Sequence, residues 1–155
     1  MKALVVDFSR VLIFANVDNV DSLNGHHKAL SVDPNYQIFD HFTLNHELLA
    51  YLRTLKDKIA IYVFTDGKLH HLSEVSTHLT GIFTGTYSVD SLGLNKKQPE
   101  AYLSLARLIS VEPDEILFVD DKISNVEAAQ SAGLQALQYT NNKVLIAELT
   151  KRLTS

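Results

Sequence analysis

Acidic side chains end three short apolar runs of this sequence. The runs are ALVVD (3–7), IAIYVFTD (59–66) and ILFVDD (116–121), and a threonine, Thr65, stands just before the acid of the second run. Carboxylates that are brought together repel one another, and either a raised pKa or a bound cation relieves the repulsion. The chain has no cysteine and no ordered set of histidines, so an all-oxygen ligand set favours Mg²⁺ over Zn²⁺. If the three runs meet in space, the sequence therefore predicts a magnesium site.

The same runs predict the elements that would position these side chains. Continuous apolar runs, unlike alternating ones, are typical of strands buried on both faces of a parallel sheet. Ligands bind outside the carboxyl ends of such strands, so residues that end separate strands converge. We expect five residues to share this edge of the sheet: Asp7, Thr65, Asp66, Asp120 and Asp121. Taken singly, each acid could equally be a helix N-cap or a turn residue.

Helical patterns separate the apolar runs. Apolar residues spaced three or four positions apart form a stripe along one face of each expected helix. The expected helices cover 46–57, 69–79 with Gly81 at its end, 98–109, 122–132 with Gly133 at its end, and 143–153. A further strand is expected at 134–139. Strands that alternate with helices indicate an α/β fold, here a doubly wound, three-layer, Rossmann-like parallel sheet.

The segment 15–45 has no sustained period and carries Asn, Asp, Gly, His and a proline. A connection of this length inside a compact domain is usually functional or poorly ordered. We expect a loop or a very small cap over the site, within a single domain that spans 1–155. Substrate specificity would reside in this segment, but its sequence contains no pattern that identifies a substrate. A partner subunit could supply a lid, so an oligomeric protein is the alternative to a monomer.

Composition narrows the classes of partner and location. The chain has 155 residues, 46% of them hydrophobic, and a formal charge of −4 without a run of Lys or Arg, which argues against nucleic acid or an anionic membrane as the main partner. The apolar run before Asp7 is too short for a signal peptide, and no run has the roughly 18 apolar residues of a membrane span. We expect a soluble, cytoplasmic protein.

Two further sequence blocks carry a recognisable pattern together with Asp7 and Thr65. KKQPEAY (96–102) and FVDDKISNVEAAQSAG (118–133) follow them, and the second block combines an apolar strand, two acids and Asn125 with a closing AAxxAG pattern. This order resembles the haloacid dehalogenase-like (HAD) hydrolase superfamily over about 2–138. The alignment of LGLNKKQPEAY with the family pattern places the motif lysine at Lys96. The resemblance implies a HAD-like core, here with a minimal cap.

The resemblance also implies roles for individual residues. Asp7 would be the nucleophile that forms an aspartyl-phosphate, Thr65 would donate to a phosphoryl oxygen, and Lys96 would neutralise developing charge. Mg²⁺ would be held by Asp7, the backbone carbonyl of Ser9 and Asp121, with support from Asp120 and Asn125. The substrate would be a small phosphorylated molecule or a phosphorylated macromolecule.

Three neighbours of these motif residues complete the expected phosphate-binding set. Arg10 could contact an anionic substrate, although a surface arginine at the start of a loop is the commoner case. Asp66 and Gly67 follow Thr65 directly and could instead be turn residues that start the next helix. We include all three as expected substrate-binding residues.

Ser9 departs from the family pattern, because most phosphatases of the family carry a second acid at this position. A serine hydroxyl is a poor general acid or base near neutral pH, and such assistance is typically worth about 10²–10⁴-fold in rate. Three alternatives remain open: a slow phosphatase, a phosphate- or partner-binding protein with little turnover, and a dehalogenase-like hydrolase that displaces at carbon. A bacterial receiver domain uses similar groups, but its acid pair comes first in the chain, which disfavours it here.

Overall fold

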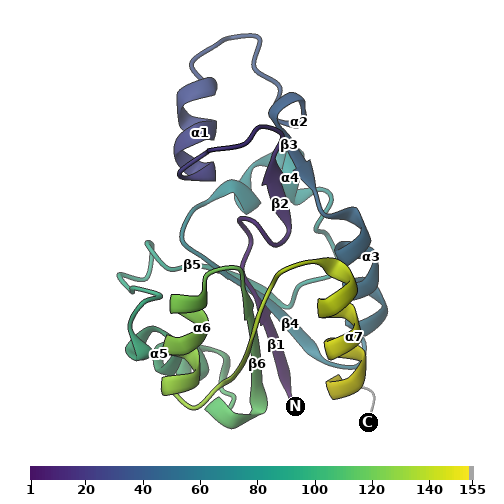
Figure 1. Cartoon of the computed structure of the whole chain (residues 1–155), viewed down its shortest axis with the longest axis vertical. Helices are drawn as coiled ribbons and strands as arrows, with labels where there is room; N and C mark the ends of the chain where they lie inside the picture. The colour runs from purple at the N-terminus through teal and green to yellow at the C-terminus, as the bar shows by residue number, and fades with distance from the viewer. Residues whose placement is uncertain (154–155) are drawn as a thin grey trace.

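The computed structural model has a five-stranded sheet at its centre (Figure 1), and it describes residues 1–153, so the last two positions of the expected domain lie outside it. All neighbouring strands of this sheet are parallel, in the order β5-β4-β1-β6-β7. This confirms the predicted Rossmann-like α/β fold. The strands are β1 (Ala3–Val6), β4 (Ala60–Thr65), β5 (Gly85–Ser88), β6 (Ile116–Asp120) and β7 (Gln135–Gln138).

Helices cover both faces of the sheet, because alternate residues of each central strand point to opposite sides. One face packs against α3 (His46–Leu55) and α7 (Asn142–Leu153), and the other packs against α5 (Pro99–Ile109) and α6 (Ile123–Ser131). In β1, Leu4 and Val6 join the first core, while Ala3 and Val5 join the second. Among residues 1–153, no helix is long and apolar enough to cross a membrane.

Two parts of the sequence pattern predicted the wrong local structure. The expected helix 69–79 is a 3₁₀ turn, η1 (Leu69–His71), and one helical turn, α4 (Ser73–Ser76), with extended backbone at Leu72 between them. Its apolar spacing still reports burial, since successive short turns can bury the same positions. The edge strand β5 was missed, because its four residues, GTYS, form no apolar run and the first three of them are only partly buried.

The segment 15–45 contains local structure that its sequence pattern does not show. Strands β2 (Ile13–Ala15) and β3 (Phe42–Leu44) pair antiparallel, and between them lie α1 (Leu23–Leu30) and α2 (Ile38–His41). Figure 1 shows these elements beyond the carboxyl ends of the sheet strands, and we call residues 16–41 the cap segment. Helix α1 has Leu23 as its buried residue, so its sequence carries no apolar stripe.

His70, in η1, is buried and lies against the ring of Phe8. Neither nitrogen of its imidazole has a hydrogen-bond partner within the described chain. Burial, followed by the nearby His71, lowers the pKa of His70 from 6.5 to about 4. The folded protein therefore disfavours the charged form of this side chain.

We predict that His70 makes the protein less stable in mild acid. Between pH 6.5 and about 4 the unfolded chain binds a proton at His70 that the folded chain does not. The free energy of unfolding should then fall with decreasing pH by up to about 1.4 kcal/mol per pH unit from this group. Urea denaturation at pH 7 and pH 5 should show a smaller fall for His70→Phe. The exposed His78, changed to Phe, is the matched control, and equal pH dependence in both variants would contradict the prediction.

Candidate active site

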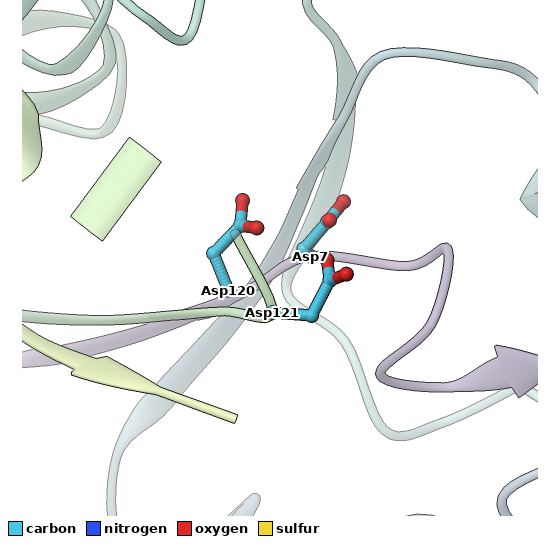
Figure 2. Close-up of side chains that lie close together, drawn as sticks. All are labelled: Asp7, Asp120 and Asp121. Carbon is cyan, nitrogen blue, oxygen red and sulfur yellow. The ribbon is translucent and has the colours of Figure 1, made fainter. Parts of the chain in front are cut away.

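The carboxyl ends of three adjacent strands bring the predicted acids together. Asp7 directly follows β1, Thr65 ends β4, Asp120 ends β6, and Asp121 comes next. Since β1 lies between β4 and β6, these ends are neighbours in the sheet. Figure 2 shows Asp7, Asp120 and Asp121 gathered there, and one carboxylate oxygen from each lies within 4.8 Å of the others. The predicted convergence of these acids is present in the structure.

Lys96 lies between two of these carboxylates and is 2% exposed. Its Nζ is 3.2 Å from Asp7 Oδ1 and 2.6 Å from Asp120 Oδ2, and it donates to the Phe64 carbonyl at 3.1 Å. Burial alone would lower the pKa of Lys96, but the charges of Asp7 and Asp120 outweigh burial and raise it. The ammonium therefore stays charged, whereas the neighbouring Lys97 is exposed.

Asp120 is fully buried, and protein donors occupy both of its carboxylate oxygens. Oδ1 accepts from the Lys122 backbone N–H at 2.9 Å, and Oδ2 accepts from the Asn125 amide at 3.0 Å as well as from Lys96. Asn125 thus orients Asp120. Asp7 and Asp121 are the two acids of the cluster that line a cavity.

Asp7 and Asp121 both carry raised pKa values. Burial raises the pKa of Asp7 to about 7, with Lys96 opposing and Asp120 adding to the shift. Burial, followed by the charge of Asp120, raises the pKa of Asp121 to about 6. The raised pKa values mean that nearby positive charge is too small to stabilise the ionised forms of these two carboxylates. A bound cation would supply that charge. Their hard oxygen donors fit Mg²⁺.

The cavity in front of Asp7 has a volume of about 90 Å³, and we call it the catalytic cavity. Ser9, Arg10, Thr65, Asp66 and Asp121 line it together with Asp7. The sequence gave no reason to expect its other lining residues, which come from the start of the cap segment helix and from the residue after the acid pair: Asp21, Ser22, Leu23, Asn24 and Lys122. Ser22 caps α1 by accepting from the Gly25 N–H, a signal too weak to identify a site residue.

Arg10 and Gly67 make contacts that the sequence did not indicate. Arg10 adopts a left-handed backbone, with φ 61°, and its guanidinium donates to the carbonyls of Val20 and Asp21. It therefore ties the cap segment to the wall of the catalytic cavity. Gly67 lies under the Asn24 amide, and a Cβ atom at Gly67 would come within 2.0 to 2.1 Å of the three terminal atoms of that side chain. Glycine at this position allows the close approach of the Asn24 side chain.

The fold and the site together define a class of protein. Acids at the ends of adjacent parallel strands, a buried lysine between two of them, and a cap inserted after the first strand are typical of HAD-like hydrolases. A family model of the haloacid dehalogenase-like hydrolases matches residues 5–133, and the chain belongs to this family.

Curated relatives of this chain include phosphatases. Enolase-phosphatase E1 of Persephonella marina is 31% identical over 95 residues, which cover 57% of this chain and 41% of the relative. The sesquiterpene phosphatase astK of Aspergillus oryzae is 31% identical over 106 residues, or 66% of this chain and 54% of the relative. The chain thus spans about half the length of these relatives.

Solved structures of HAD proteins share the fold. A predicted HAD-like family hydrolase from Porphyromonas gingivalis has a TM-score of 0.75 and 18% identity, with 100% of this chain and 98% of the other covered. A HAD family enzyme from Bacteroides thetaiotaomicron, solved with magnesium and inorganic phosphate, has a TM-score of 0.68 and 16% identity, with 90% and 94% covered. At these identities the likeness shows the fold.

We predict that Lys96→Met destabilises the protein by about 3–5 kcal/mol at pH 8, because two buried carboxylates lose their counter-charge. The loss should be smaller at pH 5.5, where the unpaired carboxylates of the variant can take up a proton. Urea denaturation at both pH values measures this difference. Lys97→Met removes an exposed charge from the adjacent position and should change the stability little at either pH. A loss for Lys96→Met that does not depend on pH would contradict this electrostatic explanation.

We also predict an energetic coupling between Gly67 and Asn24. Gly67→Ala should cost about 1 kcal/mol, at the low end of overpacking costs because a side-chain amide can rotate away. In an Asn24→Ala background the cost should nearly vanish, since the clashing atoms are gone. Gly25→Ala is the control, because its Cβ would make only ordinary contacts, at 3.6 Å from Ser22. Equal costs of Gly67→Ala in both backgrounds would argue against a close Asn24 contact.

Proposed function

We propose that this HAD-like hydrolase is a Mg²⁺-dependent phosphatase that acts through an aspartyl-phosphate on Asp7. The observation that carries the proposal is the arrangement of the Asp7 carboxylate. Its Oδ1 accepts from the Phe8 N–H at 2.7 Å and lies beside Lys96. No hydrogen bond or ion pair within residues 1–153 engages Oδ2, so one oxygen is held while the other can attack.

In the first step, Asp7 Oδ2 attacks phosphorus, the bond between phosphorus and the ester oxygen breaks, and the leaving oxygen takes a proton from solvent water to become the alcohol. In the second, water attacks phosphorus and gives a proton to the solvent, and the bond between phosphorus and Asp7 Oδ2 breaks, which releases phosphate and restores the carboxylate. Dividing the displacement lowers each barrier. The Thr65 hydroxyl, at the cavity wall, would donate to a phosphoryl oxygen, and the Lys96 ammonium would neutralise charge beside Asp7. Arg10, Asp66 and Gly67 border the same space and would help to bind the phosphoryl group.

Asp7, Asp121 and the Ser9 backbone carbonyl would hold Mg²⁺, whose charge would shield the nucleophile from an anionic substrate. Asp120 and Asn125 would support this set from behind, since Asp120 fixes Lys96 and Asn125 fixes Asp120. The Bacteroides enzyme of similar fold was solved with magnesium and inorganic phosphate, which supports this choice of ligands. The curated phosphatase relatives support the choice of reaction.

Ser9 lines the catalytic cavity at the position where a general acid is expected. Its hydroxyl can orient water but cannot readily protonate a leaving alcohol near neutral pH. The proposed phosphatase is therefore slow, or acts on esters with good leaving groups. The same residue favours a second candidate, a phosphate-binding protein with little turnover. A dehalogenase-like reaction is less favoured, because it would leave the acid pair Asp120 and Asp121 without a metal to serve.

We predict that Ser9→Asp raises the turnover of benzyl phosphate, whose alcohol leaves poorly without a proton, by about 10²–10⁴-fold, because it restores a general acid and base. The gain should require Mg²⁺ and disappear with EDTA. Ser9→Asn, of similar size but unable to exchange a proton, is the matched control. Asp7→Asn should abolish turnover, and activity that survives in it would refute Asp7 as nucleophile. A folded Ser9→Asp variant without a gain, together with a phosphate-dependent thermal shift, would favour the binding protein.

A further inference from the structure

A second cavity opens beside the catalytic cavity and shares three lining residues with it: Arg10, Leu23 and Asp121. Its volume is about 350 Å³, and we call it the side pocket. One wall of the side pocket is formed by β2 and the start of the cap segment, which contribute Phe14 and Val17. The other is formed by the residues that follow β7, which contribute Tyr139. The side pocket therefore lies next to the catalytic cavity.

The two cavities differ in size, as do the two parts of a phosphate ester, the phosphoryl group and the alcohol. The catalytic cavity, at about 90 Å³, is the smaller of the two, and its wall carries Asp7 and Thr65, which would hold the phosphoryl group. The side pocket, at about 350 Å³, is larger and falls within the usual size range of ligand pockets. The side pocket can therefore accommodate the alcohol portion of an ester.

Apolar groups form much of the side-pocket wall. Phe14 and Tyr139 are both half-buried, with ring centroids 6.1 Å apart, and Val17 and Leu23 add branched side chains. The Tyr139 hydroxyl donates to Asn142 Oδ1 at 2.9 Å, which leaves the ring as its main contribution to the pocket. Such a surface favours a partly apolar ligand.

The charges of the wall are mainly negative. Asp18 and Asp121 line the side pocket, and Asp18 makes no ion pair within the described chain. Arg10 is the cation of the wall, and it also lines the catalytic cavity, where it would contact the phosphoryl group. A second anionic group of the substrate that lay beside Asp18 would meet repulsion from that carboxylate.

We propose that the side pocket binds the alcohol portion of the substrate and selects phosphate monoesters of uncharged, partly apolar alcohols. The proposal rests on the phosphatase function proposed above. Esters whose alcohol carries a carboxylate or a second phosphate are disfavoured. Asp18 is a specificity-determining residue that takes no part in the reaction itself.

The test compares benzyl phosphate with 4-carboxybenzyl phosphate, which differ by one distant charge and have leaving oxygens of similar reactivity. We expect kcat/KM to be higher for benzyl phosphate, by about two- to fivefold from one exposed charge pair. Asp18→Lys should remove or reverse the preference. Asp57→Lys is the control. This exposed acid precedes β4, at the amino ends of the sheet strands and away from the side pocket, so its replacement should leave the preference intact. Equal kcat/KM values for the two esters would overturn the proposal.

A binding measurement separates this proposal from the proposed reaction. Benzylphosphonate and 4-carboxybenzylphosphonate cannot be hydrolysed, and their thermal shifts at equal concentration report binding alone. We expect the larger shift with benzylphosphonate, and loss of the difference in Asp18→Lys. If no phosphate ester is turned over, even by Ser9→Asp, the proposed reaction fails, and the phosphonate shifts still decide the selectivity. A larger shift with 4-carboxybenzylphosphonate, or equal shifts, would refute the side-pocket proposal.

Discussion

The Lys96 ammonium, buried between the carboxylates of Asp7 and Asp120, is the interaction on which the rest of the site depends. Three charges removed from water in one place are tolerated only where each is paired and hydrogen-bonded. The pairing joins the end of β1 to the end of β6, and the bond to the Phe64 carbonyl adds β4. One side chain thus holds the carboxyl ends of the three central strands in a common arrangement.

This arrangement separates structural acids from available ones. The carboxylate oxygens of Asp120 accept hydrogen bonds from Lys96, Lys122 and Asn125, so this acid has a structural role. Within the described part of the chain, Asp7 keeps one oxygen without a protein donor, and both Asp7 and Asp121 have raised pKa values at the cavity wall. The groups that would bind a cation and a phosphoryl group are therefore in place. Ser9, at the same wall, supplies no general acid.

The cap segment adds what the sheet alone does not provide. It reaches the catalytic cavity through the start of α1, where Asn24 lies on Gly67, and it is tied to the core by Arg10. The sequence pattern located the segment without locating its helices, because α1 buries only Leu23 and so lacks an apolar stripe. The same limit explains β5, whose four residues form no apolar run. In 69–79 the pattern was present, but it reported which side chains are buried and not a continuous helix.

The sequence by itself determined the α/β architecture, the central strands and the acids at their ends, and its motif spacing distinguished Lys96 from Lys97. These features are local, because an apolar run and the residue that ends it are adjacent in the chain. Only the tertiary structure decided which acids face the catalytic cavity, where Asn24 meets Gly67, and that a side pocket forms between Phe14 and Tyr139. Each of these depends on contacts between segments far apart in the chain, whose side chains follow no periodic pattern that could be read in advance.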